Sequence, residues 1–170
     1  PMEVQIQVDR SRETEVHEVK APGFSYRYAY ARSADSRAVG QSGQDTLVIH
    51  HDERRFVFAL CDGVSQSFQG DLAAGFVGAR LSDWLLEIPT GETSATALSA
   101  ALQTELRQLA QQAAPAVARY PLPRYVPPLL RDVLERRREI GSETMLVGVR
   151  VDVPGRGLPR GRLILTWLGD

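Results

Sequence analysis

The sequence predicts an α+β domain in which helices pack on a mainly antiparallel β-sheet. Two observations carry this prediction: strand patterns occur near both ends of the chain, and three helical patterns stand together between them. The chain has 170 residues, of which 43% are hydrophobic, and this is enough to bury one core. We therefore expect residues 1–170 to belong to a single domain.

The N-terminal segment carries two alternating patterns. Val4, Ile6 and Val8 alternate with polar residues, which is typical of a half-buried edge strand. Residues 24–30 alternate in the same way and predict a second strand. Residues 33–44 are small and polar, and they predict a loop.

Two β-rich runs, 46–49 and 56–61, stand on either side of a charged turn at 52–55 and predict a β-hairpin. The second run is apolar without alternation, which indicates that both faces of its strand are covered. Cys61, the only cysteine, lies in this run, so we expect a buried and inert thiol.

Apolar residues at helical spacing predict helices over 70–87, 93–118 and 126–139. Strand patterns return at 144–151 and 162–168 and complete the predicted sheet. We expect both tryptophans, one in the first helix and one in the last strand, to lie in the core.

Composition excludes several classes of function. The formal charge is −1, with 20 basic and 21 acidic residues, so the chain has no global field that would attract nucleic acid. No apolar run is long enough to span a membrane. The acidic N-terminus lacks the layout of a signal peptide, so we expect a cytoplasmic protein with neither nucleic acid nor membrane as a partner.

The predicted hairpin brings two aspartates together. Opposite residues of an antiparallel hairpin have numbers with a constant sum, and a turn centred on Glu53 and Arg54 gives 107. Asp45 and Asp62 also sum to 107, so their Cβ atoms would lie ~5 Å apart on one face. Two like charges at this separation destabilise a sheet unless a positive group lies between them.

A divalent cation is one such group. Carboxylate and carbonyl oxygens suit Mg²⁺ or Mn²⁺, and Gly63 adds a backbone carbonyl directly after Asp62. A second Gly-Asp pair, ending in Asp170, follows the last strand. The alternative is that these aspartates only form turns, and a register slip of one residue would place Asp45 on the other face.

Five short motifs extend this pattern. They read Ser42-Gly-Gln-Asp-Thr46, Phe58-Ala-Leu-Cys-Asp-Gly-Val64, Gly70-Asp-Leu-Ala-Ala-Gly75, Gly141-Ser-Glu-Thr-Met145 and Thr166-Trp-Leu-Gly-Asp170. In this order they resemble the metal-dependent serine/threonine protein phosphatases of the PPM, or type 2C, class, in a divergent bacterial form.

The resemblance implies a four-layer αββα sandwich, in which helices flank two antiparallel sheets and a metal centre lies at one end. It implies two or three Mg²⁺ or Mn²⁺ ions. Asp62 would bridge two cations, Gly63 would give its carbonyl, Asp45 would hold a metal-bound water, and Asp170 would lie near a third, weaker position.

The implied reaction is hydrolysis of phosphoserine or phosphothreonine in a phosphorylated protein substrate, a reaction of bacterial signalling. A water that bridges two cations attacks phosphorus in line, with no covalent enzyme intermediate. Asp45 and Asp62 are therefore the expected catalytic residues. The sequence leaves the oligomeric state open.

The chain departs from the family pattern in two ways. Family members often carry a phosphate-binding arginine five residues before the first aspartate, where this chain has Gly40. We expect Arg37, or else Arg32, to reach the phosphate instead. Family members also continue beyond the final Gly-Asp with two further aspartates, so we expect 1–170 to be the N-terminal two-thirds of the domain in a longer polypeptide.

Two alternatives arise from these departures. A catalytically inactive relative would keep the fold as a sensory or binding module. An unrelated α+β binding domain would carry the aspartates only as turn formers.

Overall fold

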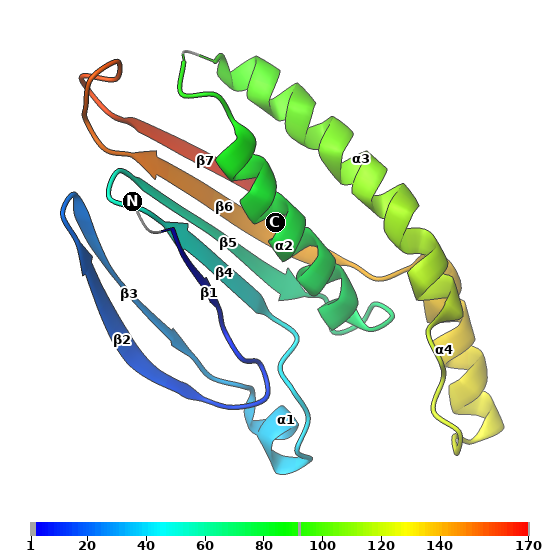
Figure 1. Cartoon of the computed structure of the whole chain (residues 1–170). Helices are drawn as coiled ribbons and strands as arrows, with labels where there is room; N and C mark the ends of the chain where they lie inside the picture. The colour runs from blue at the N-terminus through cyan, green and yellow to red at the C-terminus, as the bar shows by residue number, and fades with distance from the viewer. Residues whose placement is uncertain (1–2, 92, 170) are drawn as a thin grey trace.

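The computed structural model describes residues 3–91 and 93–169 (Figure 1). Its larger sheet has five antiparallel strands. In spatial order they are β1 (Val4–Gln7), β4 (Thr46–His51), β5 (Arg55–Gly63), β6 (Thr144–Asp152) and β7 (Arg162–Leu168).

A two-stranded antiparallel sheet packs on one face of the larger sheet. It is formed by β2 (Thr14–Ala21) and β3 (Phe24–Tyr30). The ring of Phe56 in β5 lies 5.5 Å from that of Phe24 and 4.7 Å from that of Tyr26, measured between ring centroids. Aromatic packing thus joins the two sheets.

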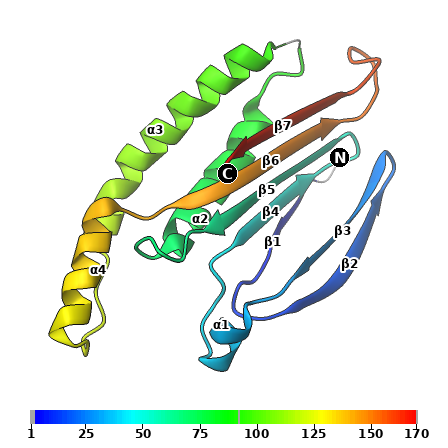
Figure 2. The same cartoon turned by 180° about the vertical axis from the view of Figure 1, so that it is seen from behind.

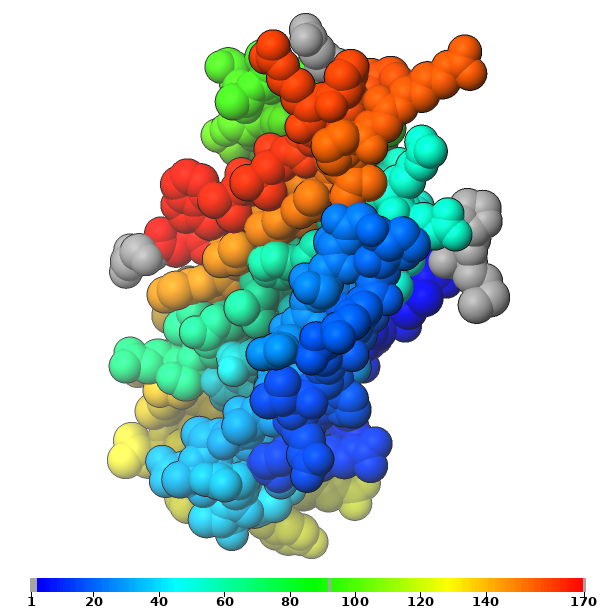
Figure 3. All heavy atoms as spheres, turned by 90° about the vertical axis from the view of Figure 1, so that its left-hand side faces the viewer, coloured from blue at the N-terminus to red at the C-terminus, as the bar shows by residue number. Residues whose placement is uncertain are grey.

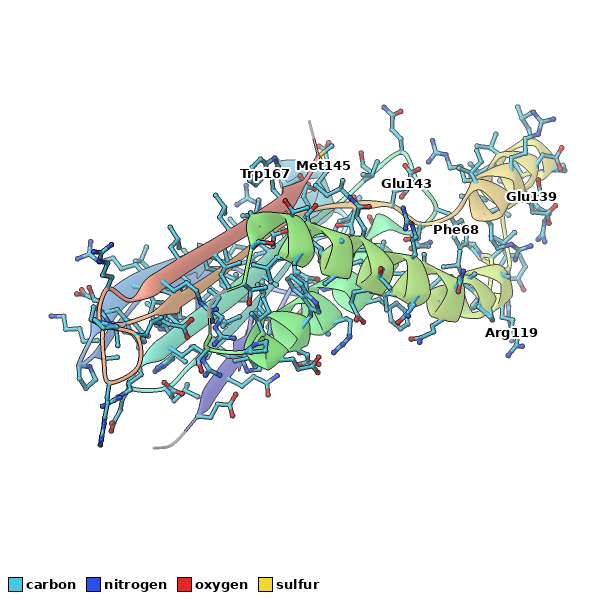
Figure 4. All side chains as sticks on the ribbon, turned by 90° about the horizontal axis from the view of Figure 1, so that it is seen from above. Phe68, Arg119, Glu139, Glu143, Met145 and Trp167 are labelled. Atoms are coloured by element: carbon cyan, nitrogen blue, oxygen red, sulfur yellow. The ribbon has the colours of Figure 1, made fainter. Side chains whose placement is uncertain are left out.

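Helices cover the other face of the larger sheet (Figures 1 and 2). Helix α2 (Gly70–Glu87) packs directly on β4, β5 and β6, and α3 (Ala95–Arg119) packs beside it. The end of α3 and α4 (Pro128–Ile140) extend past the sheet as an arm, on which Figure 4 labels Arg119 and Glu139. No helix among the described residues is long and apolar enough to cross a membrane.

Alternation along β5 determines which side chains meet which layer. Val57, Ala59 and Cys61 are buried and belong to the core beneath α2. Phe56 and Phe58 occupy the alternate positions, so they face the β2–β3 sheet. Asp62 follows the same alternation as Phe56 and Phe58, so it lies on the face of the larger sheet that is turned toward the β2–β3 sheet.

The predicted α+β fold with two antiparallel sheets is confirmed. The fold also contains two elements that the sequence analysis did not predict: strand β2, and a short helix α1 (Ala34–Ala38) inside the expected loop. The resemblance implied a layer of helices on each side of the two sheets, and the structure has one of these layers, on the larger sheet. Within residues 3–91 and 93–169, no helix packs on the outer face of the β2–β3 sheet.

One tryptophan prediction is wrong. Trp84 is buried at 8% exposure, as expected, but Trp167 in β7 is 67% exposed. The reason is visible in Figure 3, where the β2–β3 sheet leaves β6 and β7 open beside it. Leu163 and Leu165 share this open face with Trp167 and are also exposed.

Candidate metal centre

The hairpin register brings the two predicted aspartates together. Strands β4 and β5 pair Thr46 with Cys61 and continue with a constant sum of 107, as the sequence predicted. Asp45 directly precedes β4, and it lies close enough to Asp62 in β5 for the two carboxyl groups to interact. Asp45 is half-buried and Asp62 is exposed.

The surroundings of Asp45 favour its uncharged form. Burial raises the pKa of Asp45, and the hydrogen bond and negative charge of Asp62 raise it further. The amide N–H of Gly63 and the positive charge of Arg10 act in the opposite direction, but the pKa of Asp45 remains above its ordinary value. Arg10 thus offsets only part of the effect of burial and of Asp62 on Asp45.

Two glycines fix the backbone beside this pair. A Cβ on Gly63 would lie 2.7 Å from the backbone of Gly70, and one on Gly70 would lie 2.6 Å from the carbonyl oxygen of Val64. Real Cβ atoms do not approach backbone this closely, so both positions require glycine. The start of α2 thereby lies directly against the end of β5.

The Gly-Ser-Glu-Thr motif ties the same end of the sheet together. The hydroxyl of Ser142 donates to the carbonyl of Gln69 at 2.7 Å and accepts from the amide of Ala73 at 3.1 Å, which caps α2. The hydroxyl of Thr144 donates to the backbone carbonyl of Asp62 at 2.8 Å. Motifs far apart in the sequence thus meet around the aspartate pair.

A cavity of about 540 Å³ opens over the two aspartates and Gly63. Arg32 lies in its wall, whereas Arg37 is exposed on α1 and does not line it. The guanidinium of Arg32 donates to both carboxylate oxygens of Glu13, at 2.9 and 3.0 Å. Of the two arginines considered for phosphate, the structure brings Arg32 to the cavity.

The last predicted ligand, Asp170, lies outside the described residues. Gly169 is described, and its backbone lies beside the side chain of Met145, which lines the cavity and pairs with Asp62 in the sheet. The end of β7 thus reaches the same edge of the sheet, with only β6 in between. Met145 is labelled there in Figure 4.

The residues present fit a hydrated Mg²⁺ or Mn²⁺. Such an ion needs only one or two carboxylates and keeps several waters. Asp45 and Asp62 supply the carboxylates, and the open cavity leaves room for water. Among residues 3–91 and 93–169, no group of three or more acidic, histidine or cysteine side chains is arranged to hold a metal.

Two residues near the site were not predicted. Arg10 is close enough to lower the pKa of Asp45, and its guanidinium donates to the backbone carbonyl of Asp71 at 3.1 Å. Tyr30, at the end of β3, lines the cavity. The alternation of 24–30 indicated that Tyr30 faces inward, but no sequence signal showed which residues it would meet.

Comparisons with protein-family models, curated proteins and solved structures find no match for this chain. A function for this chain is therefore inferred from the geometry of its site.

Proposed function

We propose that the protein is a Mg²⁺- or Mn²⁺-dependent phosphatase that hydrolyses phosphoserine or phosphothreonine in proteins, related to the PPM class. The observation that supports the proposal is that Asp45 and Asp62 line one cavity and lie close enough for the charge of Asp62 to raise the pKa of Asp45. Two carboxyl groups in contact, with no cationic side chain between them, form a site that gains free energy when a cation binds.

Each residue has a distinct part in this proposal. Asp62, exposed at the cavity mouth, binds the cation directly, and Asp45 binds it or one of its waters. A bound divalent cation supplies Lewis-acid activation of water and neutralises phosphoryl oxygens. Arg32 lies in the cavity wall and is the residue proposed to bind the substrate phosphate. Glu13 orients its guanidinium.

The experiment is hydrolysis of an aryl phosphate by the full chain, with and without Mn²⁺. We expect turnover that requires Mn²⁺ and falls at least about a hundredfold in Asp62→Asn, since this change removes a charged ligand without changing its shape. Asp83→Asn is the matched control, because Asp83 is an exposed aspartate elsewhere on α2.

Turnover by wild type that is equal in Mn²⁺ and in a chelator would contradict the proposal. So would a Mn²⁺-dependent turnover that Asp62→Asn and Asp83→Asn leave at the same level, because it would not arise at the aspartate pair.

A second candidate function is a catalytically inactive, phosphatase-like binding module. It is favoured by the arginines: Arg37 lies outside the cavity, and the Arg32 guanidinium is already bound to Glu13 and to the carbonyl oxygen of Gln41. Under this function, calorimetry detects no Mg²⁺ or Mn²⁺ binding at low-millimolar concentration. A saturable isotherm that is lost in Asp62→Asn rejects it.

A further inference from the structure

The hydroxyl group of Tyr30 is buried and has no hydrogen-bond partner. A buried hydroxyl group without a partner costs free energy, so such a group in a native fold requires an explanation. Tyr30 is also one of the residues that line the cavity over Asp45 and Asp62.

The phenol ring is held in place by the loop that leads into β4. A Cβ on Gly43 would overlap the Tyr30 hydroxyl oxygen, at 1.7 Å, so the backbone of Gly43 lies directly against it. The amide of Gly43 is itself held by the carbonyl of Arg10, at 2.9 Å. The hydroxyl group is thus confined beside the segment that carries Asp45.

The charged groups around Tyr30 are Asp45, Glu13, Arg10 and Arg32. Arginine side chains only donate hydrogen bonds, so neither arginine can accept the hydroxyl proton. Glu13 accepts from Arg32 on both of its oxygens. Asp45, by contrast, accepts no hydrogen bond from an arginine in the described part of the chain, and it belongs to the segment that confines the Tyr30 hydroxyl group, which makes it the better placed acceptor.

We propose that Tyr30 is a positioning residue that donates its hydroxyl hydrogen bond to the Asp45 carboxylate when the aspartate pair holds a divalent cation. This inference rests on the proposed cation site. A carboxylate that holds a cation is an acceptor only, and a second donor fixes its orientation toward the ion. Gly63 supplies one donor, its backbone amide, and Tyr30 supplies the other.

The same strand provides a matched control. Tyr26 lies on the same face of β3, and its hydroxyl is also buried without a partner. Its ring packs on His51 and Phe56, at the opposite end of the hairpin from the aspartates. Tyr26→Phe removes an equivalent hydroxyl far from the cation site.

The test is Mn²⁺ binding to the full chain, measured by calorimetry, together with thermal unfolding in a chelator. We expect Tyr30→Phe to bind Mn²⁺ about tenfold more weakly than wild type, the lower end of the loss typical for a residue that orients a ligand. Its unfolding midpoint without metal should be unchanged or higher, because an unpaired hydroxyl is removed. Tyr26→Phe should keep the wild-type affinity.

A purely structural role would instead lower the unfolding midpoint without metal. The inference is overturned if Tyr30→Phe binds Mn²⁺ within about twofold of wild type, or if Tyr26→Phe shows the same loss. Wild type that binds no Mn²⁺ overturns this inference and the proposed function together. Mn²⁺ binding that weakens in Tyr30→Phe, without any aryl phosphate hydrolysis, supports the inference and removes only the proposed function.

Discussion

At one end of the five-stranded sheet Asp152 lies among three arginines, whereas at the other end Asp45 and Asp62 face each other. The carboxylate of Asp152 contacts Arg150 at 3.0 Å, Arg162 at 2.8 Å and Arg55 at 3.4 Å. Burial alone would raise the pKa of Asp152, but the hydrogen bonds from Arg150 and Arg162 outweigh it, and the pKa is lowered.

We call the end of the sheet at which arginines balance Asp152 the compensated end. Arg150 lies at this end and connects a helix to the sheet. Its side chain is 0% exposed, and its guanidinium donates to the carbonyls of Leu85 and Ile88, at 2.7 and 2.6 Å. These carbonyls lie at the C-terminal end of α2, where the helix leaves them unpaired. Arg150 therefore fastens α2 to β6, and its charge is balanced by Asp152.

The two ends differ in whether their carboxyl groups have a counter-charge, and this difference has consequences for stability. A buried charge with its partners in place holds the fold together, whereas adjacent carboxyl groups that lack a counter-charge lower stability, as expected of the proposed cation site. Substitutions at each end test this separation, beginning with the largest effect.

Arg150→Met should lower the free energy of unfolding by about 3–5 kcal/mol, because it removes one of the three arginines around the buried Asp152 and leaves the α2 carbonyls without their donor. Urea unfolding measures this loss. The exposed Arg156→Met is the control and should change stability by less than about 0.5 kcal/mol. A loss below about 1 kcal/mol for Arg150→Met would mean that the compensated end does not hold α2.

Mn²⁺ should stabilise the protein only by binding at the end of the sheet that carries Asp45 and Asp62. At a concentration of 100 times its Kd, it should add about 2.7 kcal/mol to the free energy of unfolding. We expect Asp62→Asn to abolish this gain and Asp152→Asn to retain it, as measured by unfolding with and without Mn²⁺. An equal gain in wild type and Asp62→Asn would place the cation elsewhere.

Gly63→Ala should lower stability by about 1–3 kcal/mol, because its new methyl group meets the backbone of Gly70 and the carbonyl oxygen of Gln44. Gly75→Ala lies inside α2, and its added Cβ would have no atom from the rest of the fold within 4 Å, so it should instead stabilise by about 0.5–1 kcal/mol. Chemical denaturation compares the two, and similar values would show that β5 and α2 are not in close contact beside the aspartate pair.

The two ends should respond to pH with opposite signs. The lowered pKa of Asp152 adds stability above about pH 4 that is lost as pH falls, so the advantage of wild type over Asp152→Asn shrinks in acid. The raised pKa of Asp45 adds stability below about pH 4 that is lost as pH rises in metal-free protein.

Asp45→Asn should therefore gain on wild type as pH rises above about 4, by on the order of 0.5 kcal/mol, the size typical of a cross-strand charge pair. Unfolding in chelator across a pH series measures both variants. Parallel pH dependences for the two would remove the contrast between the ends.

Much of the end of the sheet that carries Asp45 and Asp62 could be predicted because a hairpin register is set by its turn. Once the turn lay at 52–55, the register that pairs Thr46 with Cys61 followed by arithmetic, and this register brings Asp45 close to Asp62. Strand β2 could not be predicted in this way, since its Val16 is exposed and its burial does not alternate. Helix α1 is only five residues long, with Ser33 as its N-cap, which is too short for a helical period to be visible.

The remaining misses concern which surface a side chain meets. The pattern of β7 assigns Trp167 to one face but does not show that this face is uncovered. Arg150 did leave a signal, because it alternates with the buried Leu146 and Gly148 on the face beneath α2. The position of Arg37 outside the cavity depends on the path of the 31–45 loop, which no local pattern determines.

The exposed indole of Trp167 also makes the open sheet face directly observable by spectroscopy. The chain has only two tryptophans, and Trp84 is buried. In a Trp84→Phe background, intrinsic fluorescence reports on Trp167 alone and should have the red emission of a hydrated indole. Any polypeptide that covers β6 and β7 would shift this emission toward the blue.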